Sequence, residues 1–171
     1  MKLNLGCGPR HLDGFVNVDL AENWSGKEPD LSHDIRKPLP FPDQSAEEIH
    51  AYHVLEHMWR WEAEEALQDW QRVLRPGGLL VLEMPCLDKI FGIMQRCAAE
   101  GKPLPLRMTL WGLYGDPNYR NEAMCHRWCW SKAEIQAALS DMECEIKPPQ
   151  THIPERDMRI EAKKPLRLVM P

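Results

Sequence analysis

Apolar residues follow two rhythms along the chain: short runs that favour strands, and longer stretches with one apolar face that favour helices. Strands are expected at 3–5, 16–19, 31–35, 48–55, 79–84, 143–147 and 157–163. Helices are expected at 60–74, 87–100 and 131–140. Because strands and helices alternate over most of the chain, the pattern predicts an α/β domain with a doubly wound, mostly parallel sheet.

Three segments carry the clearest local signals. In 60–74 the apolar side chains repeat at helical spacing on one face, and most of the charged side chains lie on the other. Residues 79–84, Leu-Leu-Val-Leu-Glu-Met, form a nearly continuous apolar run, as expected for a strand covered on both faces. Ser131 followed by Glu134 matches a capping box, so a helix is expected to begin there.

Proline and glycine divide these elements. Three prolines in 37–43 exclude a helix or a central strand, and Arg75-Pro-Gly-Gly78 is expected to end a helix and turn the chain. Residues 103–119 are rich in proline, glycine and aromatics, and long irregular stretches in compact domains often carry function. We expect a substrate-side loop region at 101–130, within a single domain that spans 1–171.

The first nineteen residues carry the most specific chemistry. A short apolar strand runs into Gly6-Cys-Gly8, and a second strand ends on Asp19. The glycines allow a ligand to approach the backbone closely, and an ionised carboxylate accepts hydrogen bonds from two ribose hydroxyls. This combination predicts a nucleoside site, although Gly-x-Gly alone is equally compatible with a plain tight turn.

The spacing distinguishes between nucleoside ligands. A dinucleotide fingerprint has a third glycine, opens a helix and places its acid about 20 residues on. Here Asp19 follows Gly6 by 13 positions, and Pro9 and Gly14 leave no room for a full helix. Without a helix N-terminus to hold a pyrophosphate, a ligand such as S-adenosylmethionine fits better.

Charge and composition narrow the partners. A net charge of −5 argues against a general nucleic-acid binder, so no nucleic-acid partner is expected. The tail 156–167 is locally basic and is interpreted as a solvated surface strand, with a phosphate-binding patch as the alternative. No run is long enough to span a membrane, and the oligomeric state does not follow from the sequence.

The cysteines suggest a compartment and one metal candidate. The chain enters a strand at once, so no secretory signal is expected, and the six scattered cysteines favour free thiols in the cytoplasm. Cys125-His126-x-x-Cys129 has three potential zinc ligands but lacks a fourth at suitable spacing, so no metal site is expected.

Five segments in register resemble the class I S-adenosylmethionine-dependent methyltransferases, in the form with a methyltransferase type 11 domain. The similar segments are Leu3-Asn-Leu-Gly-Cys-Gly8, Val18-Asp19, His33-Asp34-Ile35, His53-Val-Leu-Glu-His57 and Leu74-Arg-Pro-Gly-Gly-Leu79. The resemblance implies a Rossmann-like seven-stranded sheet in the order 3-2-1-4-5-7-6, with helices on both faces and the seventh strand antiparallel. The family's usual first helix would be missing, because the first expected strand starts at residue 2 or 3.

The resemblance also implies S-adenosylmethionine as the cofactor. The candidate contacts that it implies are Asn4, Gly6, Cys7, Gly8, Asp19, Leu20, Asp34, Ile35, His53 and Leu55. Asp19 would bind the ribose and Asp34 would lie near the adenine amino group, although an aspartate at either position is also compatible with a simple turn. Because the segment after the glycines is short, the cofactor site is expected to be more open than is usual in the family.

His53, Glu56 and His57 follow the fourth expected strand and are the catalytic candidates. Ligands of open α/β sheets bind outside the carboxyl ends of strands, so these residues would lie between cofactor and substrate. His53 would contact the cofactor mainly through its backbone. His57 is the candidate general base, with a local hydrogen bond or a helix cap as the alternative role.

The methyl acceptor is only weakly constrained. The chain lacks the [Asn/Asp]-Pro-Pro-[Tyr/Phe] element that similar methyltransferases use on exocyclic base nitrogens, so a small molecule or sugar-type acceptor is favoured. Methyl transfer from a sulfonium is an in-line displacement, and a base is needed only if the acceptor atom carries a proton of high pKa. The alternatives are a non-catalytic module that binds S-adenosylmethionine or S-adenosylhomocysteine, and a nicotinamide-dependent enzyme.

Overall fold

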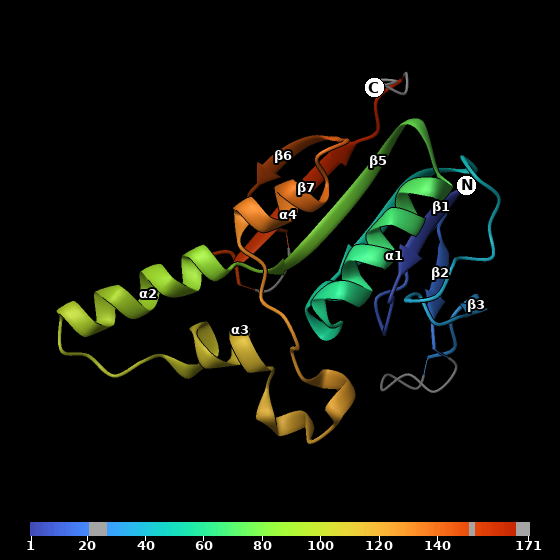
Figure 1. The fold of residues 1–171 in the computed structure, drawn as a ribbon. Coiled ribbons are helices and arrows are strands. Elements are labelled where there is room, and N and C mark those ends of the chain that lie inside the picture. The colour runs from blue at the N-terminus through green and yellow to red at the C-terminus, as the bar shows by residue number, and fades with distance from the viewer. Residues whose placement is uncertain (21–26, 151–152, 167–171) are drawn as a thin grey trace.

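The computed structural model describes residues 1–20, 27–150 and 153–166, and it contains one seven-stranded sheet (Figure 1). The strands are β1 Lys2–Leu5, β2 Val16–Asp19, β3 Leu31–Ser32, β4 Ala46–Tyr52, β5 Leu74–Pro85, β6 Glu143–Lys147 and β7 Asp157–Lys163. Their order is β3-β2-β1-β4-β5-β7-β6, and β7 runs antiparallel to both of its neighbours. The expected strand order and the antiparallel seventh strand are therefore confirmed.

Helices connect the strands. The α-helices are α1 Arg60–Val73, α2 Leu87–Ala99, α3 Leu110–Tyr114 and α4 Lys132–Ala138, and the 3-10 helices are η1 Leu55–His57, η2 Leu106–Met108, η3 Pro117–Tyr119 and η4 Glu122–Met124. The capping box that was expected at Ser131 and Glu134 starts α4. Helix α1 buries the apolar face that its sequence predicts, comprising Ala63, Ala66, Leu67, Trp70 and Val73.

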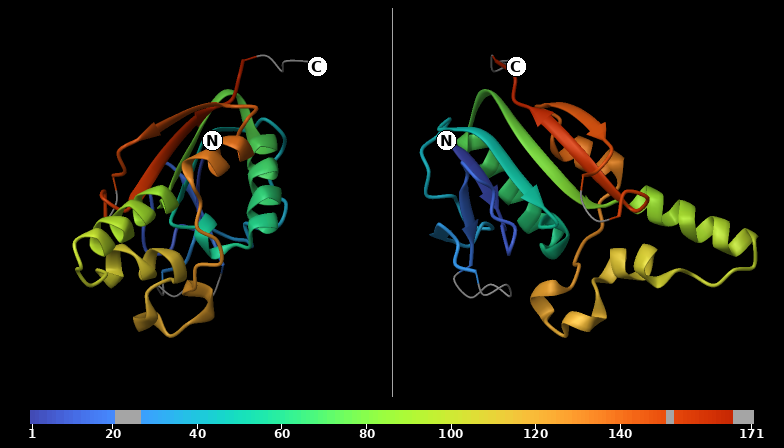
Figure 2. Two further views of the ribbon diagram at one scale, coloured as in Figure 1. Left: turned by 60° about the vertical axis from the view of Figure 1, so that its left-hand side comes forward. Right: turned by 180° about the vertical axis from the view of Figure 1, so that it is seen from behind.

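The hydrophobic core lies on one face of the sheet, where α1 and α4 pack (Figure 2). Trp70 of α1 is fully buried there, and its indole N–H donates to the carbonyl of Ile35 at 3.3 Å. Ile135 of α4 is equally buried in the same cluster. The sheet supplies its inward-facing residues, among them Leu3, Leu5, Ile49, Leu80, Leu82, Met158 and Ile160.

The opposite face of the sheet is polar. On β4, Glu48, His50 and Tyr52 alternate with the core residues, as the two-residue period of a strand requires. Glu48 pairs with Lys2 at 2.7 Å, and Arg159 of β7 pairs with Glu83 of β5 at 2.8 Å. Charged side chains on this face take the place of the apolar contacts that a second helical layer would make in a sheet buried on both sides.

Several boundaries differ from the sequence expectation. The strand expected at 48–55 ends at Tyr52, because His53 adopts a left-handed backbone with φ of 55° and the chain then turns into η1. Helix α1 ends at Val73, just before residues 75–78, as expected, but these four residues lie within β5. There the pairing jumps from Ala46 with Leu74 to Glu48 with Leu79, so these four residues form a bulge in the strand.

The basic tail is not the solvated surface strand that was expected. Strand β7 lies inside the sheet between β5 and β6, and Arg156 and Arg159 are both buried. Arg156 pairs with Asp157 at 2.6 Å, and Arg159 pairs with Glu83 and Glu161 at 2.8 Å each. Internal carboxylates therefore neutralise these arginines, while Arg167 lies outside the described residues.

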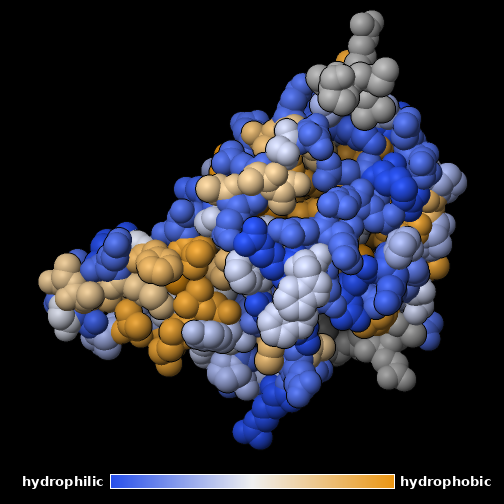
Figure 3. Space-filling model, viewed as in Figure 1, coloured by the Kyte–Doolittle hydropathy of each residue, from blue (hydrophilic) through white to orange (hydrophobic). Residues whose placement is uncertain are grey.

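The region 101–130 is not structureless. Helix α2 extends away from the end of β5, and the chain returns along it through η2 and α3 (Figure 1). Apolar residues gather over this arm, including the exposed Phe91, Leu104 and Leu106 (Figure 3). None of the helices in the described ranges is both long enough and apolar enough to cross a membrane.

Candidate functional site

The glycine loop begins where β1 ends. Gly6 and Gly8 both have left-handed backbones, with φ of 63° and 48°. The amide of Gly6 donates to the carbonyl of Val18 at 2.8 Å, which ties the loop to the neighbouring strand. A Cβ on Gly6 would lie 2.5 Å from Cγ2 of Val54 and 3.5 Å from Cδ1 of Ile35. The glycine therefore lets β1, the adenine-side segment and the chain after β4 meet closely.

Asp19 closes the loop from the end of β2. Its Oδ2 accepts the amide of Gly8 and its Oδ1 accepts the amide of Leu20, both at 2.7 Å. Each carboxylate oxygen offers two acceptor positions, so both oxygens retain capacity for a ligand hydroxyl. The carboxylate is only partly buried, and Leu20 beside it is exposed.

An amide network supports the loop from below. The side chain of Asn4 donates to the carbonyl of Arg10 at 2.8 Å and to Oδ1 of Asn17 at 2.9 Å. Asp30 in turn accepts both the backbone and the side-chain amide of Asn17, at 2.8 and 2.7 Å. Asn4 is almost fully buried, so its contribution to a cofactor site would be to hold the loop.

Cys7 lies inside the loop and is buried. Burial, reinforced by the charge of Asp19, raises the pKa of the Cys7 thiol to about 11. The thiol is therefore neutral at physiological pH. In the proposed cofactor site Cys7 is a small apolar wall residue, not a nucleophile.

The adenine-side candidates follow β3. Asp34 is bound by the guanidinium of Arg36 through two hydrogen bonds of 2.9 Å, and this contact lowers the pKa of Asp34. Ile35 is buried beside Gly6. Arg36 thus already binds the Asp34 carboxylate, and it also reaches Glu62 of α1 at 3.4 Å.

The chain after β4 places three polar side chains in a row. The amide of His53 donates to the carbonyl of Glu83, and Nδ1 of His53 lies 3.0 Å from Oε1 of Glu56. Nε2 of His53 lies 3.7 Å from Oδ2 of Asp157. His53 therefore bridges two buried carboxylates, while its backbone supports the turn beside Val54.

Glu56 is almost fully buried. Burial alone would raise its pKa, but the hydrogen bond and the charge of His53 outweigh it and lower the pKa to about 2. The same pairing raises the pKa of His53 against the opposing effect of its own burial. Glu56 is thus a permanent anion at neutral pH and cannot act as a general acid there.

His57 faces a segment far along the chain. Its Nδ1 lies 3.2 Å from the carbonyl of Cys125, and its ring meets the ring of His126 edge to face at 4.9 Å between centroids. Nδ1 of His126 lies 2.9 Å from the carbonyl of Gly112. Burial lowers the pKa of His57, so its imidazole is neutral at physiological pH.

Residues 125–130 are hydrogen-bonded to η1. The amides of Arg127 and Trp128 both donate to the carbonyl of Glu56, and the Arg127 guanidinium donates to the carbonyl of His57. Trp128 packs against the core, and Trp130 is fully buried in it. The sequence gives no signal that His126 meets Glu56 and His57, because these residues are far apart along the chain.

The sequence-based candidates separate into two neighbouring groups, one around the glycine loop and one formed by Glu56 and His57 in η1. The glycine loop, Asp19, Ile35 and the turn after Tyr52 meet at the carboxyl ends of β1, β2, β3 and β4. The strand order places the topological switch between β1 and β4, where open α/β sheets bind ligands. Leu55 is buried in the core, so only its backbone is available to a cofactor. These assignments stay predictions.

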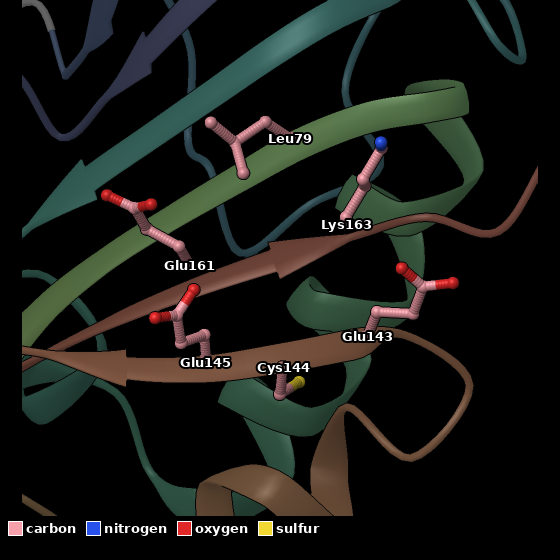
Figure 4. A pocket seen from close by; sticks show the side chains of 6 residues that line it. All are labelled: Leu79, Glu143, Cys144, Glu145, Glu161 and Lys163. Carbon is pink, nitrogen blue, oxygen red and sulfur yellow. The ribbon is translucent and has the colours of Figure 1, made fainter.

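A separate hollow of about 400 Å³ lies at the other end of the sheet (Figure 4). It is lined by Leu79, Glu143, Cys144, Glu145, Glu161 and Lys163. Three of its lining residues are glutamates, none is a glycine, and it lies toward the amino end of β5. It is therefore not the candidate nucleoside site.

Comparison with known proteins agrees with this geometry. Residues 3–82 match the model of a methyltransferase domain family, which covers β1 to β5 and therefore the glycine loop, Asp19 and the turn after β4. The matched residues make up a little under half of the chain, and together with the fold they support a class I methyltransferase domain. The match and the fold indicate S-adenosylmethionine as the cofactor of this domain.

Solved structures share the fold of this methyltransferase domain at low sequence identity. A S-adenosylmethionine-dependent methyltransferase from Archaeoglobus fulgidus aligns with a TM-score of 0.63 and 16% identity, over 95% of this chain and 85% of its own. One from Methanosarcina mazei aligns with a TM-score of 0.64 and 16% identity, over 97% and 92%. A comparison with curated proteins gives no match.

The thiols of the methyltransferase domain are expected to react at very different rates. At pH 8 a thiol with a pKa of about 11 is ionised to only about one part in a thousand, so Cys7 should label at least about 100-fold more slowly than the exposed Cys125. Burial raises the pKa of Cys129 to about 12, so it should also react slowly. Mass spectrometry of iodoacetamide-treated peptides over time measures these rates.

Labelling in denaturant provides the control, because all six thiols then become equivalent. Fast labelling of Cys7 in the folded protein would contradict the closed loop described here.

Proposed function

We propose that the protein is a S-adenosylmethionine-dependent methyltransferase that acts on a small-molecule or sugar-type acceptor. The single observation that supports this proposal most is the hydrogen bond from Gly8 to Asp19, which joins the carboxylate to a loop of two left-handed glycines beside the switch point of the sheet. That pairing offers a carboxylate to a ribose and a bare backbone to the rest of a nucleoside. The free thiols of all six cysteines suit a cytoplasmic enzyme.

The proposed cofactor position follows from the contacts of the loop. Asp19 would accept the ribose hydroxyls, while Gly6 and Gly8 would border the methionine portion. Ile35 and Val54, which flank Gly6, supply apolar walls. The Asp34 carboxylate, which Arg36 already binds, would contribute to the adenine pocket as an ion pair.

The reaction would be an in-line displacement at the sulfonium methyl. S-adenosylmethionine supplies a good leaving group, so the protein mainly has to orient the acceptor and exclude water. His57 is the proposed base where the acceptor atom carries a proton, because its neutral imidazole accepts one. Glu56 would stabilise the resulting imidazolium as a fixed anion.

The experiment that tests this function is ligand-dependent thermal unfolding. S-adenosylhomocysteine at about 100 times its Kd is expected to raise the Tm by roughly 5–10 °C. NAD at the same concentration should give no shift, because the loop has no helix N-terminus for a pyrophosphate. A shift with NAD alone would contradict the assignment and favour a nicotinamide-dependent enzyme.

Catalysis needs a separate measurement. Incubation with S-adenosylmethionine and a pool of small metabolites is expected to yield a product heavier by one methyl group, detected by mass spectrometry. S-adenosylhomocysteine binding with no methylated product from any acceptor class would favour the non-catalytic binding module.

A further inference from the structure

Three potential metal ligands meet at the carboxyl end of β4. Glu56 and His57 come from η1, and His126 comes from the segment that follows η4. One ligand atom from each side chain lies within 4.8 Å of the other two. Among residues 1–20, 27–150 and 153–166, no other group of three such side chains converges in this way.

The hydrogen bonds of the two histidines favour the metal-binding form. Nδ1 of His57 faces the carbonyl of Cys125, and Nδ1 of His126 faces the carbonyl of Gly112. A carbonyl oxygen only accepts, so each Nδ1 must carry its proton in a neutral ring. Nε2 of both rings then has a lone pair, which is the arrangement found in histidines that ligate metals.

The carboxylate of Glu56 also has one oxygen available to a metal ion. His53 binds Oε1, whereas the buried Oε2 has no hydrogen-bond partner among the described residues. A buried carboxylate oxygen without a partner costs free energy, and a cation at this point would remove that cost. The single negative charge also balances part of the charge of a divalent ion.

We propose that Glu56, His57 and His126 form a site for a divalent transition-metal ion, of which Zn²⁺ is the best match. Two imidazole nitrogens and one carboxylate oxygen suit zinc, and they suit Mg²⁺ or Ca²⁺ poorly. Three protein ligands leave a fourth coordination position open, as in zinc sites that bind water or a substrate atom.

The proposed ion would also link two parts of the fold. Glu56 and His57 directly follow the sheet, whereas His126 belongs to the segment tethered by Arg127. An ion at this point would hold that segment against the end of β4. An ion at this point would occupy Nε2 of His57, so His57 would act as the proposed base only in the metal-free protein. Zinc binding itself depends on these three side chains and not on S-adenosylmethionine.

The test is metal titration of protein without a histidine tag. With Zn²⁺ alone, calorimetry is expected to give one ion per chain. With Co²⁺ alone, visible absorption bands typical of a four-coordinate ion should appear and saturate at the same ratio. Saturating Zn²⁺ should raise the Tm by roughly 5–10 °C at 100 times its Kd.

Variants identify the ligands. H126A and H57A are each expected to weaken Zn²⁺ binding by at least about 100-fold, with circular dichroism confirming that they fold. C125S and H33A are the matched controls, because Cys125 neighbours His126 without joining the cluster and His33 lies after β3. Both controls should bind Zn²⁺ as the wild type does.

Two results would overturn the proposal. One is the absence of stoichiometric Zn²⁺ or Co²⁺ binding by the wild-type protein. The other is tight binding that survives in both histidine variants or disappears in C125S, which would place the ion on other ligands. Neither result bears on S-adenosylhomocysteine binding, so failure of the metal site and failure of the proposed function are distinguishable.

Discussion

Replacing Asp19 with alanine is expected to abolish the thermal stabilisation by S-adenosylhomocysteine. The carboxylate would bind two ribose hydroxyls, and hydrogen bonds to a charged group contribute about 1.5–3 kcal/mol each. Losing both weakens binding by at least about 100-fold. Part of the loss comes from the amide of Gly8, which Asp19 holds at 2.7 Å and which would no longer be fixed.

Two further variants separate these contributions. D13A changes an exposed aspartate of the same loop and should keep the full Tm shift. D19N keeps the shape of the side chain and one acceptor oxygen, so it should bind more tightly than D19A and more weakly than the wild type. If D19A shows the wild-type shift, Asp19 does not bind the ribose.

Replacing Gly6 with alanine is expected to destabilise the fold by roughly 2–5 kcal/mol. A left-handed backbone costs a non-glycine residue about 1–2 kcal/mol, and overpacking adds about 1–3 kcal/mol. The new Cβ would lie 2.5 Å from Cγ2 of Val54, which is well inside van der Waals contact. For a chain of 171 residues this predicts a fall in Tm of roughly 5–15 °C, measured by circular dichroism.

Gly14 provides the matched control. It has a φ of 79°, but a Cβ there would meet nothing within 4 Å, so G14A should show the backbone cost alone. In the V54A background the overlap is absent, so replacing Gly6 with alanine should lower the Tm less than the same replacement does in the wild type. Equal Tm values for G6A and G14A would mean that the contact with Val54 relaxes freely.

The local elements were largely predictable from the sequence. The helical spacing of 60–74 identified α1 and its buried face, and the Ser131–Glu134 pair identified the start of α4. These features depend on residues within a few positions of one another. The positions of the glycine loop and of Asp19 at strand ends were also predictable, because Asp19 follows Gly6 by 13 positions and Gly8 by 11.

Features that depend on distant pairing were not predictable. The basic residues of β7 were interpreted as part of a surface strand, because local sequence does not reveal that Arg159 pairs with Glu83, 76 residues away. His57 and His126 meet across a similar distance, so the cysteine motif around His126 suggested an incomplete site. The bulge at 75–78 likewise depends on pairing with β4, which helix-ending residues do not specify.

The amide network under the glycine loop has a consequence for binding kinetics. Because Asn4, Asn17 and Asp30 already hold the loop in place, little conformational entropy remains to be lost when a nucleoside arrives. Association should then follow a single step without a slow ordering phase, and affinity among cofactor analogues should differ mainly in dissociation rate. Preorganisation of this short loop before the ligand binds thus offsets the small number of contacts that it makes.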